Sequence, residues 1–479
     1  MRTAILVLFF IVAAGPPAAF ARDGREAKVG PEAATIDRAA DGVGVDVDEA
    51  GPVDEPPTAA RPVIHRHGYR LSIGSWSVRF SFPPGIDLLD LGDRARAFMG
   101  LLLIVWVGVY LSDDRRAISW RLVFWCLAVQ WVLAVFLLRT APGDRLLGAA
   151  GGMVDALVGG LRVVRDGPAA YLVGFVALPA VVLGSVASAL LYHLGVVQRL
   201  VRGFASATAW LPGTSGAESL DAAATMLVGQ TEAPLTIRPY LPRLTNSELL
   251  TVMTVGMANV SGLTMAAYVV FGVDPRQILL SVLLSAPGAI LISKLLVPET
   301  GTPETYGGRQ PAFARADAGL PAAVWRGTRE GICMAFFIAA ALIVAFGLIA
   351  MIDRALGLLG GSLEAFLGWA LAPVAYILGV AWEDCRPVGA VLGTRTALNE
   401  LVAIADLSHL RGAILDRSFI IAGFALCGFA NLGSTAVQIW GLGALAPERR
   451  ADLYRLGARA LLAATLANFL SACIAGVLV

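Results

Sequence analysis

Residues 228–234 read VGQTEAP and residues 398–402 read LNELV, and each stretch places a carboxylate inside a long apolar segment. A charged side chain at the centre of a bilayer is costly, so such residues are rare there and by default functional. Irregular backbone at membrane depth is tolerated only where protein or a water-filled cavity satisfies its polar groups. We therefore expect two re-entrant hairpins whose tips carry Glu232 and Glu400.

Each hairpin, expected over 205–245 and 360–410, is followed about one membrane crossing later by a break in an apolar span. The breaks read GMANVSG at 256–262 and GFANLGS at 428–434. Glycines alone would equally suit close helix packing, but paired interrupted segments in two halves are typical of a transporter site. Cut helix ends offer N–H groups to a polar solute and C=O groups to a cation. The pattern predicts an inverted repeat around one cavity.

Composition places the chain in a membrane. Of its 479 residues 57% are hydrophobic and only 15% are charged, with a mean hydropathy of +0.71. A typical soluble domain has about 25% charged residues. The net charge of +1 gives no basic excess, so nucleic acid is not expected as a partner.

Eight apolar runs approach the roughly 20 residues that cross the hydrocarbon core. Their ranges are 97–112, 119–138, 170–194, 246–272, 276–297, 331–352, 418–443 and 460–479. The amphipathic, glycine-containing segment at 144–165 better suits a helix in the membrane interface. The expected fold is an all-α polytopic membrane protein with eight transmembrane helices, two re-entrant hairpins in an inverted repeat, and interfacial helices.

The N-terminal region is expected to lie outside the membrane. Residues 1–21 have the apolar run and small residues of a secretory signal peptide, with cleavage before Arg22. An uncleaved first helix is the alternative, but the run is short and two prolines end it. Residues 22–60 are acidic and poor in large apolar groups, which predicts a flexible extracytoplasmic linker. The small segment at 61–96 alternates enough to form a short hairpin.

Basic residues indicate the orientation, because they favour cytoplasmic loops. An extracytoplasmic mature N-terminus assigns to the cytoplasm Arg115, Arg116, Arg121, Arg199, Arg202, Lys294, Arg309, Arg315, Arg326, Arg329, Arg449, Arg450, Arg455 and Arg459. Arg411 and Arg417 contradict this scheme. The prediction is a multi-pass inner-membrane protein with three membrane regions: 97–204, 205–352 with the first hairpin, and 353–479 with the second.

An enzyme is the main competing class. The chain contains no HExxH, GxSxG or Walker motif, and the nearest Walker-like stretch, 389–394, lacks the lysine. The scattered cysteines are interpreted as small core residues: Cys126, Cys333, Cys385, Cys427 and Cys473. A passive channel is a third class, which dependence of uptake on an ion gradient would exclude.

Long stretches resemble the concentrative nucleoside transporter family, and the similarity runs from about residue 98 to the C-terminus. It is carried by GTSGAES at 213–219, GQTEAPLTIRPYLPRLTNSEL from Gly229, SAP at 285–287, PET at 298–300, Asn399-Glu400, ALCGFANLGS from Ala425 and LAPERR from Leu445. The resemblance implies a homotrimer, with a central scaffold domain and a transport domain that moves like an elevator. The family usually has Phe after Asn-Glu, whereas this chain has Leu401, which puts pocket shape and base preference in question.

The resemblance also implies roles for individual residues. Gln230 and Thr231 would bind the nucleobase, Glu232 would assist through water, and Thr264 would lie beside the base. The second half would supply the groups that hold or flank the ribose: Asn399, Glu400, Phe429, Asn431 and Ser434. Amides and carboxylates suit this task because they offer the donors and acceptors that base edges and hydroxyls need.

A coupling sodium ion would lie between the first hairpin tip and the break that follows it. In the family an Asn on the hairpin and a Ser or Thr on the span bind it together with backbone carbonyls. Here Thr225 and Asn259 hold these positions, so the two side chains are exchanged, and Val228 and Val260 would lend carbonyl oxygens. Sodium accepts such oxygens from either residue type, while a proton on a hairpin carboxylate is the alternative. The predicted function is sodium-driven nucleoside import without any cofactor; proton coupling and another small polar solute remain alternatives.

Overall fold

A computed structural model describes residues 43–47, 68–73, 76–81, 88–159, single positions between 182 and 199, 214–230, 233–260, 265, 268–269, 271–305, 319–358 and 362–479. The expected signal peptide and most of the expected span at 170–194 lie outside these residues. So do Thr231, Glu232 and Thr264, three of the expected substrate ligands.

A small antiparallel sheet precedes the helices. Its strands are β1 (Val43–Val47), β2 (Gly68–Ile73) and β3 (Trp76–Ser81), in the order β1-β2-β3. The β2–β3 pairing sets Tyr69 opposite Phe80 and forms the hairpin that the alternation predicted. The expectation of a flexible linker was wrong at β1, whose VGVDV pattern carries three valines, a residue type that favours strands.

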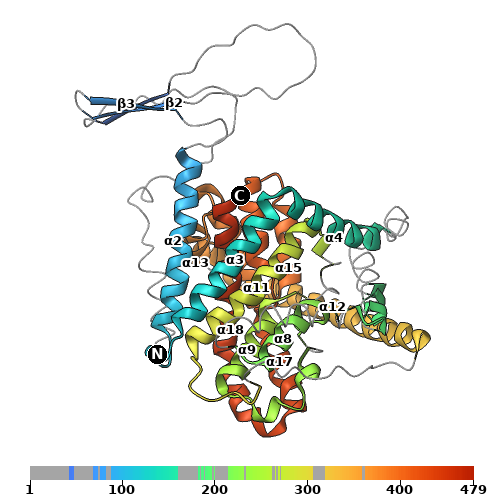
Figure 1. The fold of residues 1–479 in the computed structure, drawn as a ribbon. Coiled ribbons are helices and arrows are strands. Elements are labelled where there is room, and N and C mark those ends of the chain that lie inside the picture. The colour runs from blue at the N-terminus through green and yellow to red at the C-terminus, as the bar shows by residue number, and fades with distance from the viewer. Residues whose placement is uncertain are drawn as a thin grey trace, which may run out of the picture.

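From residue 88 onward the described chain is helical (Figure 1). The α-helices are α2 (Leu88–Tyr110), α3 (Trp120–Arg139), α4 (Ala141–Gly159), α8 (Gly216–Val228), α9 (Asn246–Ala258), α11 (Pro275–Leu296), α12 (Leu320–Gly357), α13 (Leu363–Ile377), α14 (Cys385–Ala397), α15 (Glu400–His409), α16 (Asp416–Leu426), α17 (Leu432–Leu445) and α18 (Arg450–Leu478). Short 3₁₀ helices are η3 (Ala233–Ile237), η4 (Leu241–Arg243), η5 (Trp382–Asp384) and η6 (Pro447–Arg449).

Three described helical stretches are long and apolar enough to cross a membrane: Trp120–Leu138, Pro275–Leu296 and Pro447–Leu478. The first two nearly coincide with the spans expected at 119–138 and 276–297, and the third contains most of the span expected at 460–479 but begins 13 residues earlier. Most of the span expected at 97–112 lies in α2. The span expected at 331–352 lies wholly in α12. The expected interfacial segment overlaps α4, which packs against α3 and α11.

The centre of the molecule is formed by α11 and α18, which pack against each other (Figure 1). In the apolar window of α11 89% of residues are buried, against 33% in that of α3. A helix that is apolar all round belongs in the interior of a bundle, whereas α3 presents Phe124 and Val132 outward. The α11–α18 pair also contacts α9 and α16, and so supports both halves of the expected repeat.

Helix α12 extends away from this body (Figure 1) and has 38 residues. At about 1.5 Å per residue it is nearly twice as long as the roughly 30 Å hydrocarbon core is thick. Its described outward side chains include Trp325, Phe336 and Met351, each at least 70% exposed. This helix therefore offers a large apolar surface that the rest of the described chain does not cover.

The range expected as one second hairpin contains two units. The hairpin itself is α14 and α15, which turn at Leu398 and Asn399, while α13 is a separate apolar helix packed on α14. The first hairpin has α8 as one limb, but its return limb is η3 and η4. Pro234, Pro239 and Pro242 explain this irregular limb, because each proline lacks an N–H donor and disfavours the α conformation before it.

Arg411 and Arg417 contradicted the orientation scheme. Both donate hydrogen bonds to backbone carbonyls at helix ends or in loops. Arg417 donates to Gly379 O, just beyond α13, at 2.7 Å, and to Gly476 O near the end of α18. Arg411 donates to Gly272 O at 2.7 Å. The last carbonyls of a helix have no partner within it, and a cation suits that end. Both arginines therefore have a structural role in binding backbone carbonyls, which does not depend on the orientation of the chain.

Two side-chain amides, Gln130 and Gln277, join helices at glycines. Gln130 of α3 donates to Leu284 O of α11 at 2.8 Å, beside Gly288. Gln277 of α11 donates to Ile420 O of α16 at 2.8 Å, beside Gly423. Small residues let helices approach closely and polar side chains then bond across the contact. Because each glycine has no side chain, the amide occupies the space that a Cβ atom would fill.

Candidate functional site

The second crossing is broken as predicted: α16 ends at Leu426 and α17 begins at Leu432. Asn431 is the N-cap of α17, and its side-chain oxygen accepts from Ser434 N at 2.8 Å. The cap satisfies one of the free N–H groups at that end, and the others leave it electropositive. The start of α17 is therefore suited to hold an anionic or oxygen-rich group.

The opposite cut end is satisfied by two side chains that the sequence analysis did not single out. Arg395 of α14 donates to Ala425 O, and Asn468 of α18 donates to Cys427 O at 2.9 Å. Arg395 is 1% exposed. A basic residue within an apolar membrane hairpin is by default functional, so the signal for Arg395 was present in the sequence.

Glu400 is the first residue of α15 and is buried at the second hairpin tip. Asn431 Nδ2 donates to Glu400 Oε2 at 2.5 Å, which joins this tip to the break. Asn399 is the N-cap of α15, and its side-chain oxygen accepts from Val402 N at 2.9 Å. Glu400, Asn431 and Ser434 are thus brought together, with Phe429 buried in the same break.

The first hairpin turns at Gly229, where α8 ends. This residue has φ +103°, a left-handed conformation that glycine adopts without steric cost. Gly229 N donates to Thr225 O at 3.2 Å, and Ala233 N donates to Gly229 O at 3.1 Å, which closes the tip. Gln230 therefore lies at the apex of a tight turn.

The first crossing is also broken, since α9 ends at Ala258 and Asn259 caps it. The two breaks adjoin, because a Cβ atom on Gly428 would lie 2.7 Å from Ala258 O. Thr435 Oγ1 donates to Met257 Sδ at 3.5 Å across the same contact. The interrupted segments of both halves therefore lie side by side.

Helix α17 has a polar side that faces inward. Its buried polar residues are Asn431 at the cap, then Ser434, Thr435 and Gln438, whereas Leu432 and Trp440 are more than 60% exposed. This spacing of three, four and seven residues defines one helical face. The predicted site residues on this face end at Ser434, whereas Gln438 lies about one turn further on and was not predicted.

Gln438 reaches the first hairpin. Its Nε2 lies 3.4 Å from both the backbone O and the side-chain Oε1 of Gln230. Seven residues of helix, about 10 Å, separate Gln438 from Asn431, which bonds Glu400. Both hairpin tips therefore contact one face of α17.

The expected cation ligands are placed as follows. Thr225 Oγ1 donates to Asp221 O at 2.8 Å, which leaves its hydroxyl lone pairs available. Asn259 donates to Val255 O at 3.3 Å, and its side-chain oxygen accepts from Ser285. Val228 is the last residue of α8, and Val260 is buried just beyond Asn259. These oxygen donors fit a hard monovalent cation, although no hydrogen bond joins Thr225 to Asn259 in the described chain.

Asp221, one helical turn before Thr225, was not anticipated. It is 1% exposed, and neither carboxylate oxygen has a hydrogen-bond partner among the described residues. Burying an unpaired charge is strongly unfavourable. A carboxyl group so placed would ionise only with a cation beside it, and Asp221 lies one turn before an expected cation ligand.

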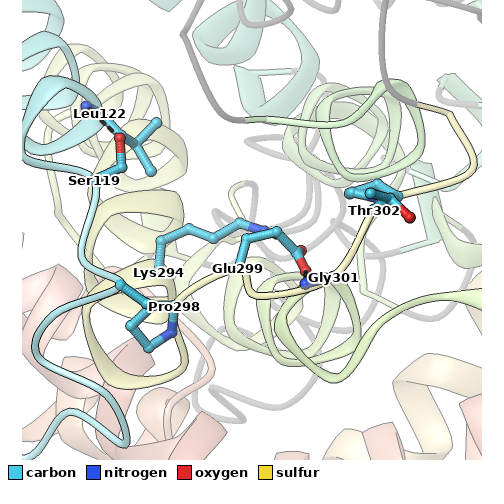
Figure 2. Close-up of a pocket in the computed structure, with 9 residues that line it drawn as sticks. Ser119, Leu122, Lys294, Pro298, Glu299, Gly301 and Thr302 are labelled. Carbon is cyan, nitrogen blue, oxygen red and sulfur yellow. Dashed lines mark hydrogen bonds and ion pairs between the residues drawn. The ribbon is translucent and has the colours of Figure 1, made fainter.

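A separate charged cluster lies where α8, α9 and α11 meet. Lys294 Nζ contacts Glu218 Oε2 at 2.9 Å, Glu299 Oε2 at 3.2 Å and Ser247 Oγ at 3.1 Å. This cluster borders a cavity of about 320 Å³. Figure 2 shows the Lys294 side chain extending towards Glu299. The cavity is lined by Ala117, Ser119, Leu122, Lys294, Pro298, Glu299, Gly301, Thr302 and Pro303. It contains none of the predicted substrate ligands.

One further expectation that can be checked concerns the cysteines. Four cysteines are buried, whereas Cys333 is exposed on α12, so its assignment to the core was wrong. An outward-facing α12 explains the difference, because an apolar residue in a membrane helix need not face protein. In the described part of the chain, no group of three or more His, Cys, Asp or Glu residues could hold a metal ion.

Three family descriptions match successive parts of the chain. "Na+ dependent nucleoside transporter N-terminus" covers residues 99–160, "Nucleoside recognition" covers 174–274, and "Na+ dependent nucleoside transporter C-terminus" covers 277–476. Together they extend over nearly all of the membrane region.

Individual relatives agree with these matches. A Haemophilus influenzae protein described as an uncharacterized transporter is 35% identical over 80% of this chain and 97% of its own length. Rat sodium/nucleoside cotransporter 1 is 34% identical over 82% of this chain, which spans only 65% of that longer protein. The structure of CNTnw in an inward-facing substrate-bound state is 35% identical with a TM-score of 0.76, covering 80% of this chain and 97% of that one.

Proposed function

This chain belongs to the Na+-dependent, concentrative nucleoside transporter family, and from that premise we propose that it imports nucleosides across the inner membrane by sodium symport. The observation that carries the proposal is the hydrogen bond between Asn431 and Glu400. It holds a buried carboxylate at two helix N-termini inside a membrane protein. Such a group accepts hydrogen bonds from sugar hydroxyls.

In the proposed complex the two hairpin tips hold opposite ends of the solute. Glu400, Asn431 and Ser434 bind the ribose, with Phe429 packed nearby and Asn399 fixing the start of α15. The residues assigned to the base are Gln230 and Thr231, with Glu232 acting through water and Thr264 beside the ring. The separation of about 10 Å along α17 supports this division, because a nucleoside can bridge it.

Sodium is proposed to bind beside the first hairpin tip. Thr225 and Asn259 contribute side-chain oxygens, and Val228 and Val260 contribute backbone carbonyls. The nearby unpaired carboxylate of Asp221 supports a cation in this region, since a positive charge there would offset a buried negative one.

The proposed transport cycle is of the elevator type, in a homotrimer. CNTnw has been solved in inward-facing, outward-facing and intermediate states, which supports alternating access in the family. The exposed apolar side chains of α12, Trp325, Phe336 and Met351, are compatible with contact with other copies, because such side chains in a membrane protein meet either protein or lipid. The relatives are transporters, which argues against an enzyme.

The proposal is tested by uptake of labelled uridine and adenosine into proteoliposomes, with sodium and pH gradients imposed separately. We expect accumulation above the external concentration with inward sodium and none without it. Accumulation driven by pH alone would establish the proton-coupled alternative. Equal uptake without either gradient would contradict coupling, and chemical change of the recovered solute would indicate an enzyme.

A further inference from the structure

Gln438 is a buried amide in an unusual position. It is 2% exposed on the inward face of α17, and α17 also meets α9 and α18. The other described amides that lie against glycines, such as Gln277, bond the backbone of a neighbouring helix. Gln438 instead contacts a hairpin tip.

A glycine makes this contact possible. A Cβ atom on Gly256 of α9 would overlap Gln438 Nε2 and would lie 3.3 Å from Gln230 Cβ. The amide is therefore enclosed between α9, α17 and the first hairpin tip. Since three elements confine it, Gln438 has little freedom to turn elsewhere.

The contact uses one particular atom of Gln230. Gln438 Oε1 has no hydrogen-bond partner among the described residues, whereas its NH₂ group donates towards Gln230 Oε1 and the Gln230 backbone O. A glutamine amide has one acceptor oxygen and one NH₂ donor group. With its oxygen engaged, Gln230 is left to present its NH₂ group to a ligand.

We propose that Gln438 is a positioning residue for base recognition: it fixes the side-chain amide of Gln230 so that the first hairpin tip presents donors to the nucleobase. This inference rests on the proposed function, because it requires Gln230 to face the base. Without Gln438 the Gln230 amide can rotate and offer either edge. Uridine and cytidine differ in the donors and acceptors that such an amide would meet. N3 donates in uridine and accepts in cytidine, and position 4 carries an acceptor in uridine and a donor in cytidine.

The test measures KM and maximal uptake of uridine, cytidine and adenosine in proteoliposomes for the wild type and Gln438→Met, with Gln277→Met as the matched control. Met keeps the length of the side chain but cannot hydrogen-bond as a donor. For Gln438→Met we expect KM to rise about tenfold with maximal uptake little changed, and at least one KM ratio between nucleosides to shift about threefold or more. Gln277→Met removes a partly buried amide from a glycine contact that involves neither hairpin tip, so its KM ratios should match the wild type.

KM ratios do not depend on the amount of folded protein, so they remain informative if either variant is less stable. A second variant, Gly256→Ser, displaces the Gln438 amide without changing it and should shift the ratios in the same way. Wild-type KM values and ratios in Gln438→Met would overturn this inference alone. A wild-type protein that binds and transports none of the three nucleosides would overturn the proposed function and this inference with it.

Discussion

The amide of Asn431 donates a 2.5 Å hydrogen bond to the carboxylate of Glu400, and it thereby links the break in one crossing to the tip of a hairpin. Asn431→Asp replaces this donor by a second acceptor and sets two carboxylates against each other. Because hydrogen bonds to charged groups contribute about 1.5–3 kcal/mol, we expect uridine affinity to fall at least about tenfold. Calorimetric titration of the purified protein measures this. Asn246→Asp, on the exposed start of α9, should leave affinity unchanged; equal affinities in both variants would contradict the proposed ribose site.

The contact between the two breaks depends on Gly428. A methyl group there would lie 2.7 Å from Ala258 O and would overlap the Asn468 amide, so Gly428→Ala should separate the broken segments. We expect a clear fall in melting temperature and loss of uridine uptake. Gly441→Ala in α17 is the control, since a Cβ atom added there would meet nothing within 4 Å and alanine favours a helix by up to about 1 kcal/mol. A Gly428→Ala protein as stable and active as Gly441→Ala would show that the breaks do not need this approach.

Asp221 should make sodium stabilise the folded protein. A ligand that binds only the folded state raises its stability as the ligand concentration rises. In Asp221→Asn the carboxylate charge is absent, so the sodium-dependent rise in melting temperature should shrink or vanish, and sodium-driven uptake should fall with it. The exposed loop variant Asp114→Asn should keep the wild-type sodium response. If Asp221→Asn responds to sodium as the wild type does, this carboxylate takes no part in cation binding.

Lys294 should be a strong determinant of stability. Its ammonium group pairs with Glu218 and Glu299 where both the lysine and Glu218 side chains are almost fully buried. Removing one partner of a buried pair typically costs about 3–5 kcal/mol, because the other charge stays uncompensated. Lys294→Met should therefore lower the melting temperature sharply, and Lys294→Met with Glu218→Gln should recover part of the loss. No recovery in the double variant would mean that the contribution of Lys294 does not come from this charge pair.

The main features of the membrane part could be predicted from sequence. Hydrophobic runs predicted α3, α11 and most of α18, because a helix that crosses a bilayer must be apolar over nearly its whole length. The paired motifs located both breaks and the meeting of Glu400 with Asn431, since buried charge and helix interruption are visible in one dimension.

Other features depend on partners that lie far away in sequence. The role of Arg395 rests on Ala425 O, and that of Gln438 on Gln230 and Gly256, so neither contact follows from local spacing. The separation of α13 from the second hairpin was missed because apolar content does not reveal where one packed helix ends and the next begins. β1 was missed because its pairing with β2 lies across a long intervening segment.

The apolar run within α12 makes the protein responsive to the lipid around it. This run, 331–352, lies between Glu330 and Asp353 and is about as long as the hydrocarbon core is thick, so a thinner bilayer favours a greater tilt of the helix and a thicker one a smaller tilt. Acyl-chain length thus acts mechanically on this helix, so vesicles made from short-chain and long-chain lipids would hold the same polypeptide at different inclinations.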